Sequence, residues 1–193
     1  MRVRFAQVAA LALLSTAVLA ESPRGNATAT IGGKKITIDY GRPALKGRAL
    51  ADLLKQLSED RVWRAGDDQV TTLTAETDIQ IGGKKIKAGK YSVYVHLPAD
   101  GSRNLLLNTD LGQPLIKLWD KAPADRANAP WPYIGNYQAK IGDKELLRAA
   151  MTKETTAAPV DLFTIDLGSA KDSAKLKLSW GEESWSIDVK AAK

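Results

Sequence analysis

The sequence ITIDYGRPALKGR at residues 36–48 carries the most specific pattern in the chain. Ile36, Ile38 and Tyr40 alternate with polar residues, which is the period of a half-buried β-strand. Gly-Arg-Pro then interrupts the strand, because proline fixes its own φ angle and has no N–H to donate. Three cations follow within seven residues: Arg42, Lys46 and Arg48. We therefore expect a strand that ends in a rigid, positively charged turn.

A second glycine-containing break, VWRAGDDQVTT at residues 62–72, contributes Arg64. Arginine binds carboxylate and phosphate groups through two parallel hydrogen bonds. If the two breaks lie together, they form a site for a small anion with four candidate residues: Arg42, Lys46, Arg48 and Arg64. The alternative is that these arginines lock the loops by pairing with the protein's own groups. The partners would then be Asp39, Asp67, Asp68 or backbone carbonyls.

Alternating apolar and polar residues separated by short turns recur through most of the chain. Gly32-Gly33 stands between two β-prone runs and predicts a tight hairpin turn. Residues 145–156 have high helix propensity, but we favour a strand there. Residues 175–190 predict a hairpin with its turn at 181–184. Short strands at this spacing predict a mainly β fold, either an antiparallel β-sandwich or an open barrel.

One segment departs from the β pattern, at residues 49–58. Four leucines recur there at positions i, i+3, i+4 and i+7, which places them on one face of an α-helix: Leu50, Leu53, Leu54 and Leu57. We expect one short helix at about residues 49–58, packed across one end of the β structure.

Residues 1–20 have the three parts of a secretory signal peptide. Arg2 and Arg4 precede an apolar run, and small residues lead up to Ala20. The run is too short to span ~30 Å of hydrocarbon. We expect cleavage after Ala20, export to the periplasm or beyond, a single β domain at 21–193, and no membrane span after cleavage.

The chain has 193 residues, a net charge of +6 and no cysteine. Without cysteine, neither disulfides nor thiol chemistry is available to an exported protein. The basic residues are interspersed with acids, and no basic run interleaves with aromatic residues. We therefore expect solvated faces and no nucleic-acid partner.

Residues 111–144 contain four of the eight prolines together with several aromatic residues. Proline is excluded from central strands, so we expect a short strand at 115–119 followed by a long loop. Loops of this length are usually functional or disordered. The aromatic side chains of the loop either stack on a sugar ligand or seal the sandwich, and they form a second candidate patch: Trp119, Trp131, Tyr133 and Tyr137.

The sequence lacks the residues that several kinds of site require. His96 is the only histidine, so a nitrogen and sulfur metal cluster is not available, and we expect no metal and no cofactor. A serine triad would need His96, yet no G-x-S-x-G motif occurs. GRPALKGR lacks both the glycine spacing and the Lys-Ser/Thr pair of a phosphate loop. We predict no catalytic residue, although a pair of distant carboxylates for glycoside cleavage stays open.

Five pieces of sequence together resemble one family: SPR at 22–24, ITIDYGRPALKGR at 36–48, VWRAGDDQVTTLT at 62–74, GGKKIKAGKYSVYVHLP at 82–98, and FTIDL with LKLSWGEESWSIDV near the end. On these motifs the chain resembles the exported bacterial family catalogued as domain of unknown function 2911. The resemblance implies an exported, mostly β protein with no established activity. Two departures stand out. The segment after Arg48 is longer and more helical, and the proline-aromatic loop replaces a Trp-Gly element.

We therefore expect a non-catalytic binding or envelope-associated protein. Its ligand would be a small anion or a carbohydrate held near Arg42, Arg48 and Arg64. Two alternatives stay open. One is a hydrolase that acts on glycans through carboxylates the sequence does not identify, and the other is a structural module of an envelope assembly.

Overall fold

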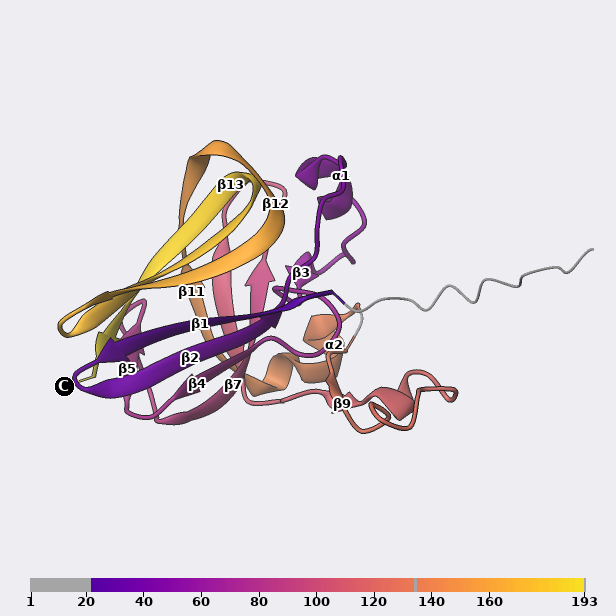
Figure 1. Cartoon of the computed structure of the whole chain (residues 1–193), viewed down its shortest axis with the longest axis horizontal. Helices are drawn as coiled ribbons and strands as arrows, with labels where there is room; N and C mark the ends of the chain where they lie inside the picture. Colours follow the sequence, from indigo (N-terminus) through magenta and orange to yellow (C-terminus); the bar gives the residue numbers. More distant parts are fainter. Residues whose placement is uncertain (1–21, 134, 193) are drawn as a thin grey trace, which may run out of the picture.

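The computed structural model describes residues 22–133 and 135–192, which form two antiparallel sheets packed face to face (Figure 1). The larger sheet has the strand order β1-β2-β4-β7-β8-β11, and β3 pairs with the end of β7. The smaller sheet has the order β12-β13-β5-β6. The predicted mainly β fold is therefore confirmed as a sandwich. The expected signal peptide at residues 1–20 lies outside the described residues.

The elements have the following bounds. The larger sheet contains β1 (Arg24–Ile31), β2 (Lys34–Gly41), β3 (Val62–Trp63), β4 (Thr72–Ala75), β7 (Gly89–His96), β8 (Asn104–Asn108) and β11 (Glu145–Ala150). The smaller sheet contains β5 (Ile79–Ile81), β6 (Lys84–Ile86), β12 (Thr152–Ala170) and β13 (Ser173–Ala191). The remaining elements are the ribbon of β9 (Gln113–Pro114) and β10 (Pro130–Trp131), the helices α1 (Leu50–Leu54) and α2 (Tyr137–Ile141), and the 3₁₀ turns η1 (Leu115–Lys117) and η2 (Gly142–Lys144).

The core lies between the two sheets, and β2 contributes to it with the predicted alternation. Ile36, Ile38 and Tyr40 are all buried. They join one continuous apolar cluster with side chains of the smaller sheet, whose largest fully buried members are Trp185 and Phe163. Burying a large apolar side chain contributes about 1.5–3 kcal/mol to stability, so this interior is what holds the two sheets together.

Hydrogen bonds between residues 40–46 and residues 161–165 join the two sheets along a line that we call the seam. It begins at Tyr40, whose hydroxyl donates to the carbonyl oxygen of Ile165 (3.2 Å) and accepts from the backbone N–H of Ile165 (2.9 Å). Both bonds are buried. The last residues of β2 are therefore tied directly to the backbone of β12.

The seam continues past the proline. The carbonyl oxygen of Pro43 accepts from the backbone N–H of Phe163 (2.9 Å), and the N–H of Leu45 donates to the carbonyl oxygen of Asp161 (2.9 Å). This pairing explains how the Gly-Arg-Pro break remains ordered outside the larger sheet. The chain leaves β2 and immediately runs alongside β12.

The second break crosses the first at Gly41. A Cβ atom on Gly41 would lie 2.0 Å from the carbonyl oxygen of Asp67, and one on Gly66 would lie 2.6 Å from the hydroxyl oxygen of Thr71. Only glycine allows the backbones to approach this closely. The two glycine-containing breaks therefore meet, as the anion-site hypothesis requires.

The hairpin predicted at 175–190 is wrong. β13 continues through these residues, and the chain reverses between β12 and β13 instead. Gly181 adopts a left-handed φ of 61°, and the pairing register with β12 shifts around it. The strand therefore bulges there and does not turn. A Cβ atom at Gly181 would lie 3.2 Å from the Cβ of Leu50, so the bulge is where α1 packs.

Other expectations change in detail. The strand predicted at residues 115–119 is wrong, because η1 occupies this position and the strand pairing occurs one step earlier, in β9. The predicted helix at 49–58 is present as α1, although it is shorter than expected. The long loop predicted at 111–144 contains the short helix α2. Residues 145–156 are extended as predicted, but the single strand expected there is divided at Met151 into β11 of the larger sheet and the start of β12 of the smaller sheet.

The substitution Gly41→Ala tests the crossing of the two breaks. Because the added methyl overlaps the backbone of Asp67, we expect the free energy of unfolding to fall by about 1–3 kcal/mol, the usual cost of overpacking. Gly168→Ala is the matched control, since the nearest atom there lies 4.0 Å from the added Cβ. Urea unfolding of both variants gives the comparison. Equal stability of the two would contradict the crossing.

A buried ion pair stabilises β13 next to the core. Arg103, whose side chain is 6% exposed, donates to Glu183 at 2.9 Å. Glu183 also accepts from Lys153 (2.6 Å) and from the indole of Trp185 (3.0 Å). Burial raises the pKa of Glu183, but the hydrogen bonds from Lys153, Trp185 and Arg103 together outweigh burial and hold the pKa below its usual value of 4.5.

This pair predicts part of the acid sensitivity of the fold. A carboxyl whose pKa is lower in the folded state stabilises the fold above its unfolded pKa and loses that contribution as the pH falls through its folded pKa. We expect Glu183→Gln to reduce the loss of stability below pH 4.5, measured as melting temperature against pH. Glu182→Gln, an exposed neighbour, should retain the wild-type profile. A wild-type profile for Glu183→Gln would refute this account.

Candidate ligand-binding cavity

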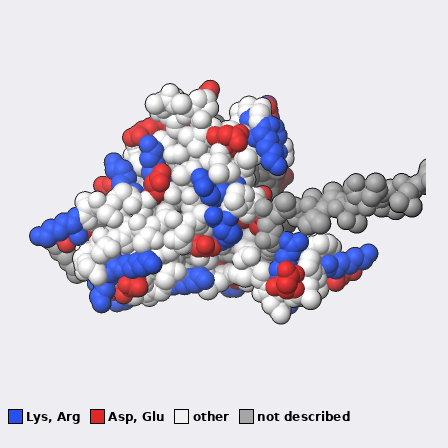
Figure 2. Space-filling model, viewed as in Figure 1, with Lys and Arg blue, Asp and Glu red and all other residues white. Residues whose placement is uncertain are grey.

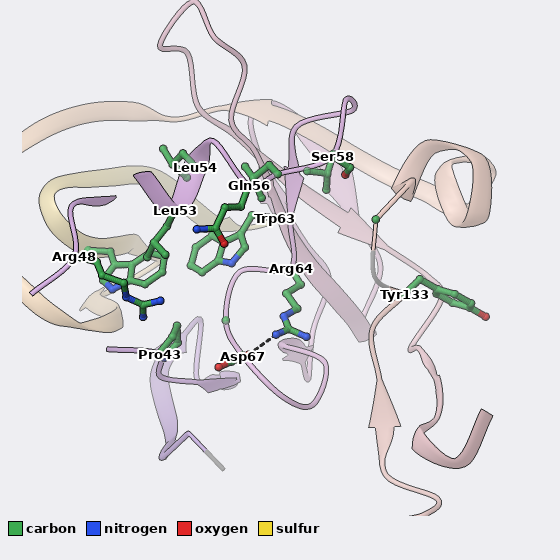
Figure 3. A pocket seen from close by; sticks show the side chains of 15 residues that line it. Pro43, Arg48, Leu53, Leu54, Gln56, Ser58, Trp63, Arg64, Asp67 and Tyr133 are labelled. Atoms are coloured by element: carbon green, nitrogen blue, oxygen red, sulfur yellow. Dashed lines mark hydrogen bonds and ion pairs between the residues drawn. The ribbon is translucent and has the colours of Figure 1, made fainter. Parts of the chain in front are cut away.

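A cavity of about 560 Å³ opens at the end of the sandwich where the two breaks meet (Figure 3). This volume is within the range of small-molecule sites. The apolar part of its wall consists of Pro43, Leu53, Leu54, Leu57, Val62, Trp63 and Trp180. The polar part consists of Arg48, Gln56, Ser58, Arg64, Asp67 and Tyr133, with Gly66 and Gly135 completing the lining.

Two tryptophans form a rigid aromatic wall. Trp63 and Trp180 stack with their centroids 5.0 Å apart and their planes 12° apart. Phe163 packs edge-on against Trp63, with the centroids 4.7 Å apart. Trp180 is nearly fully buried, whereas Trp63 is half-buried and lines the cavity. Trp63 therefore packs against the core and also forms part of the cavity wall.

Leucines of α1 and of the segment that follows it face the cavity. Leu50 is buried against the bulge at Gly181, but Leu53, Leu54 and Leu57 stay only partly buried and line the cavity. Figure 1 shows α1 standing beside the end of the sandwich. The helix therefore packs at one end of the β structure, as predicted, while leaving half of its apolar face turned toward an open space.

Arg48 lies at the rim and carries an unneutralised charge. Its guanidinium donates from Nε to the carbonyl oxygen of Leu45 (2.8 Å) and from Nη2 to that of Ala44 (3.0 Å). Both acceptors are neutral, and no described acid forms an ion pair with Arg48. Lys46 and Gly47 adopt left-handed conformations (φ 52° and 77°), so the turn directs Arg48 back over the cavity.

Arg64 lies across the cavity, and Figure 3 shows Trp63 between Arg64 and Arg48. Nη2 of Arg64 forms an ion pair with Oδ1 of Asp67. The same carboxylate accepts hydrogen bonds from the hydroxyl of Ser22 and the backbone N–H of Asp68, both at 3.0 Å. Asp67 therefore holds Arg64 in place and neutralises its charge.

The other two predicted cations lie elsewhere. Arg42 donates from Nε to the carbonyl oxygen of Phe163 (3.2 Å) and from Nη2 to the hydroxyl of Thr164 (2.9 Å), so it reinforces the seam and does not line the cavity. Lys46 is exposed, and its backbone N–H donates to Asp161 (3.0 Å). The structure thus brings Arg48 and Arg64 together at the cavity and leaves Arg42 and Lys46 outside it.

The second candidate patch is dispersed. Tyr137 is buried against Tyr94 and accepts a hydrogen bond from Asn108 (2.9 Å), so it seals the outer face of the larger sheet. Trp131 lies in β10, and Trp119 is 43% exposed. Only Tyr133 of this patch lines the cavity, and its hydroxyl points away from the arginines (Figure 3).

A carboxylate outside the cavity fixes one of its walls. Asp60 accepts from the hydroxyl of Ser58 (2.7 Å) and from the backbone N–H of Gln138 (3.1 Å). Burial raises the pKa of Asp60, but these hydrogen bonds outweigh burial and hold the pKa below its ordinary value. Asp60 therefore stays ionised near neutral pH and uses up the hydroxyl hydrogen of Ser58.

His96 lies at the end of β7, away from the cavity lining. Burial lowers its pKa, and the nearby Arg148 lowers it further, so the ring is neutral at pH 7. Within residues 22–133 and 135–192, no cluster of three or more His, Cys, Asp or Glu side chains is placed to hold a metal ion. No helix in the same residues is long and apolar enough to cross a membrane.

The sequence alone did not identify several cavity residues. Leu53, Leu54 and Leu57 have the spacing of an ordinary core-facing stripe, and Trp180 lies on a strand face like any other core residue. Gln56 and Ser58 belong to no motif. The missing information is which apolar side chains face an open space, and that depends on contacts between α1 and residues more than 100 positions away.

The family described as "Protein of unknown function (DUF2911)" matches residues 22–189. The chain belongs to this family. The match spans both breaks, α1 and nearly all of β13, so all of the cavity lies within it. Comparison with curated proteins and comparison with solved structures found no match.

The positions of Arg42 and Lys46 predict different effects of their substitution on the stability of the ligand-free protein. Arg42→Ala removes two hydrogen bonds of the seam and leaves their acceptors unsatisfied, so we expect a loss of about 1–3 kcal/mol in the free energy of unfolding. Lys46→Ala, at an exposed side chain, should change it by less than about 0.5 kcal/mol. Urea unfolding distinguishes the two. A silent Arg42→Ala variant would show that Arg42 does not support the seam.

Proposed function

We propose that this protein is an exported, non-catalytic binding domain. Its ligand is a small anion or a sugar that enters the cavity next to Arg48 and Arg64. One observation carries the proposal: an open cavity of small-molecule size is lined by two guanidinium groups and by a stacked tryptophan pair. Pockets with apolar walls and a few convergent polar groups are the usual form of small-molecule sites.

The composition of the lining favours binding over glycan hydrolysis. Glycoside cleavage requires two carboxyl groups that flank the scissile bond. Asp67 is the single carboxylate among the described residues that line the cavity, and it is engaged by Arg64, Ser22 and Asp68. The described lining therefore holds no second carboxylate that could complete such a pair with Asp67.

The proposal of export rests on the signal-like residues 1–20. Figure 2 shows lysines and arginines intermixed with acids over the face in view, with no region of a single charge sign there. This pattern supports a solvated domain that works through a cavity more than one that docks through a charged face.

The proposal is tested by the melting temperature of the mature chain in the presence of phosphate, citrate, glucuronate, glucose and 3-phenylpropionate. A ligand present at 100 times its dissociation constant stabilises the fold by about 2.7 kcal/mol. We expect at least one compound of this panel to raise the melting temperature.

Two variants locate the binding. Gln56 is exposed and lines the cavity, so Gln56→Trp fills the cavity and should abolish the shift. Ala51→Trp adds the same bulk to an exposed position of α1 outside the lining and should retain it. The proposal fails if no compound shifts the melting temperature or if Gln56→Trp leaves the shift unchanged.

A further inference from the structure

Resting on the proposed function, we infer that the cavity selects a small monoanion with an apolar body, a carboxylate whose hydrocarbon or aromatic part lies between Trp63 and the leucines of α1. Arg48 binds the carboxylate. Three independent features of the lining lead to this ligand class: its net charge, the exposed apolar surface it leaves, and the scarcity of free hydrogen-bonding groups.

The charge of the lining amounts to one positive unit. Arg48, Arg64 and Asp67 are its charged residues. Asp67 pairs with Arg64, which leaves the charge of Arg48 opposed only by the carbonyl oxygens of its own turn. A single carboxylate balances this charge. A phosphate monoester or citrate would bring excess negative charge against apolar walls, where an uncompensated charge is costly.

The guanidinium group of Arg48 is already held in position to bind a carboxylate. Two of its hydrogen bonds fix the guanidinium to the turn through Nε and Nη2, while Nη1 has no protein acceptor among the described residues. A guanidinium held in place loses little side-chain entropy when it binds a carboxylate. Arg64, restrained by Asp67, contributes a second group of donors on the other side of Trp63.

The apolar wall of the cavity favours a ligand that has an apolar part. Leu53 and Leu54 of α1, and Leu57 in the segment after it, are only partly buried and line the cavity. Trp63 lines the same space with its stacked partner behind it. An apolar ligand body would remove these surfaces from water, which stabilises the complex by roughly 25 cal/mol per Å² of apolar area.

The cavity lining offers few hydrogen-bonding groups to a sugar. Each buried hydroxyl needs a hydrogen bond to offset the loss of water. The hydroxyl of Ser58 already donates to Asp60, and that of Tyr133 points away from the arginines. Gln56 and the indole N–H of Trp63 are then the remaining uncharged side-chain groups in the described lining that can hydrogen-bond to a ligand. The lining therefore fits a ligand with one charged end and an apolar remainder better than a polyhydroxyl compound.

The test is isothermal titration calorimetry of the mature chain with 3-phenylpropionate, 3-phenylpropanol, acetate and glucuronate. The first compound has both the charge and the apolar body, and each of the others lacks one of them. We expect 3-phenylpropionate to bind at least about tenfold more tightly than each of the other three, a difference of 1.4 kcal/mol. Arg48→Gln should reduce its affinity to that of the alcohol.

A second variant tests the charge count. Asp67→Asn keeps an acceptor for Ser22 but frees the charge of Arg64, so the affinity for the dianion phenyl phosphate should rise about tenfold relative to that for 3-phenylpropionate. Arg48→Lys serves as the folding control for Arg48→Gln, because it retains the charge and should retain part of the affinity.

The outcomes separate the two proposals. If a compound binds in a way that Gln56→Trp blocks, but the alcohol, acetate or glucuronate equals 3-phenylpropionate, the inference about ligand class is overturned while the binding function stands. The same holds if Arg48→Gln leaves the affinity unchanged. If none of the compounds binds, the binding function fails and the inference fails with it.

Discussion

The structure depends on the seam, where residues 40–46 run hydrogen-bonded along residues 161–165. Tyr40 alone donates to and accepts from the backbone of Ile165, more than 120 positions away. The seam fixes the distance between the two sheets at one end and closes the core there. It also carries the chain out of the larger sheet and into the turn that presents Arg48. Without the seam, residues 43–45 would lose their backbone pairing with β12.

The cavity is a consequence of this arrangement. The seam brings the first break to the end of the sandwich, and the crossing of Gly41 with Asp67 brings the second break onto it. The bulge at Gly181 then makes room for Leu50 and anchors α1 nearby. Gly41, Gly66 and Gly181 thus mark the positions where two backbone segments, or α1 and β13, approach each other closely. The space left between these contacts is the cavity. The conformational permissiveness of glycine therefore determines where the cavity forms.

Much of the fold could be predicted from the sequence, because period-2 alternation and glycine turns are local signals. Ile36, Ile38 and Tyr40 were correctly assigned to an inward face, and Gly32-Gly33 to a hairpin turn. The failures were of two kinds. Gly181 has the same local signature whether the strand turns or bulges, and only the continuous pairing with β12 distinguishes the two. The direction of Arg42 is likewise set by a carbonyl group on a distant strand.

The sequence located the two breaks that meet beside the cavity, but it did not reveal which residues line the cavity. Arg48 and Arg64 were identified because cations in rigid, glycine-containing breaks are locally visible. The apolar half of the site was hidden, since Leu53, Leu54 and Leu57 have the spacing of a core stripe and only the folded structure shows that they face a hollow.

The central claim is that Trp63, Arg48 and α1 enclose a binding site for a small amphipathic anion. It is tested most directly by ¹⁵N NMR of the mature chain titrated with 3-phenylpropionate, following the indole N–H of Trp63 and the Nε–H of Arg48. We predict that these two signals and the amides of α1 shift together along one binding curve, while those of β5 and β6 stay in place. Signals of Trp63 and Arg48 that do not move at saturating ligand would contradict the account.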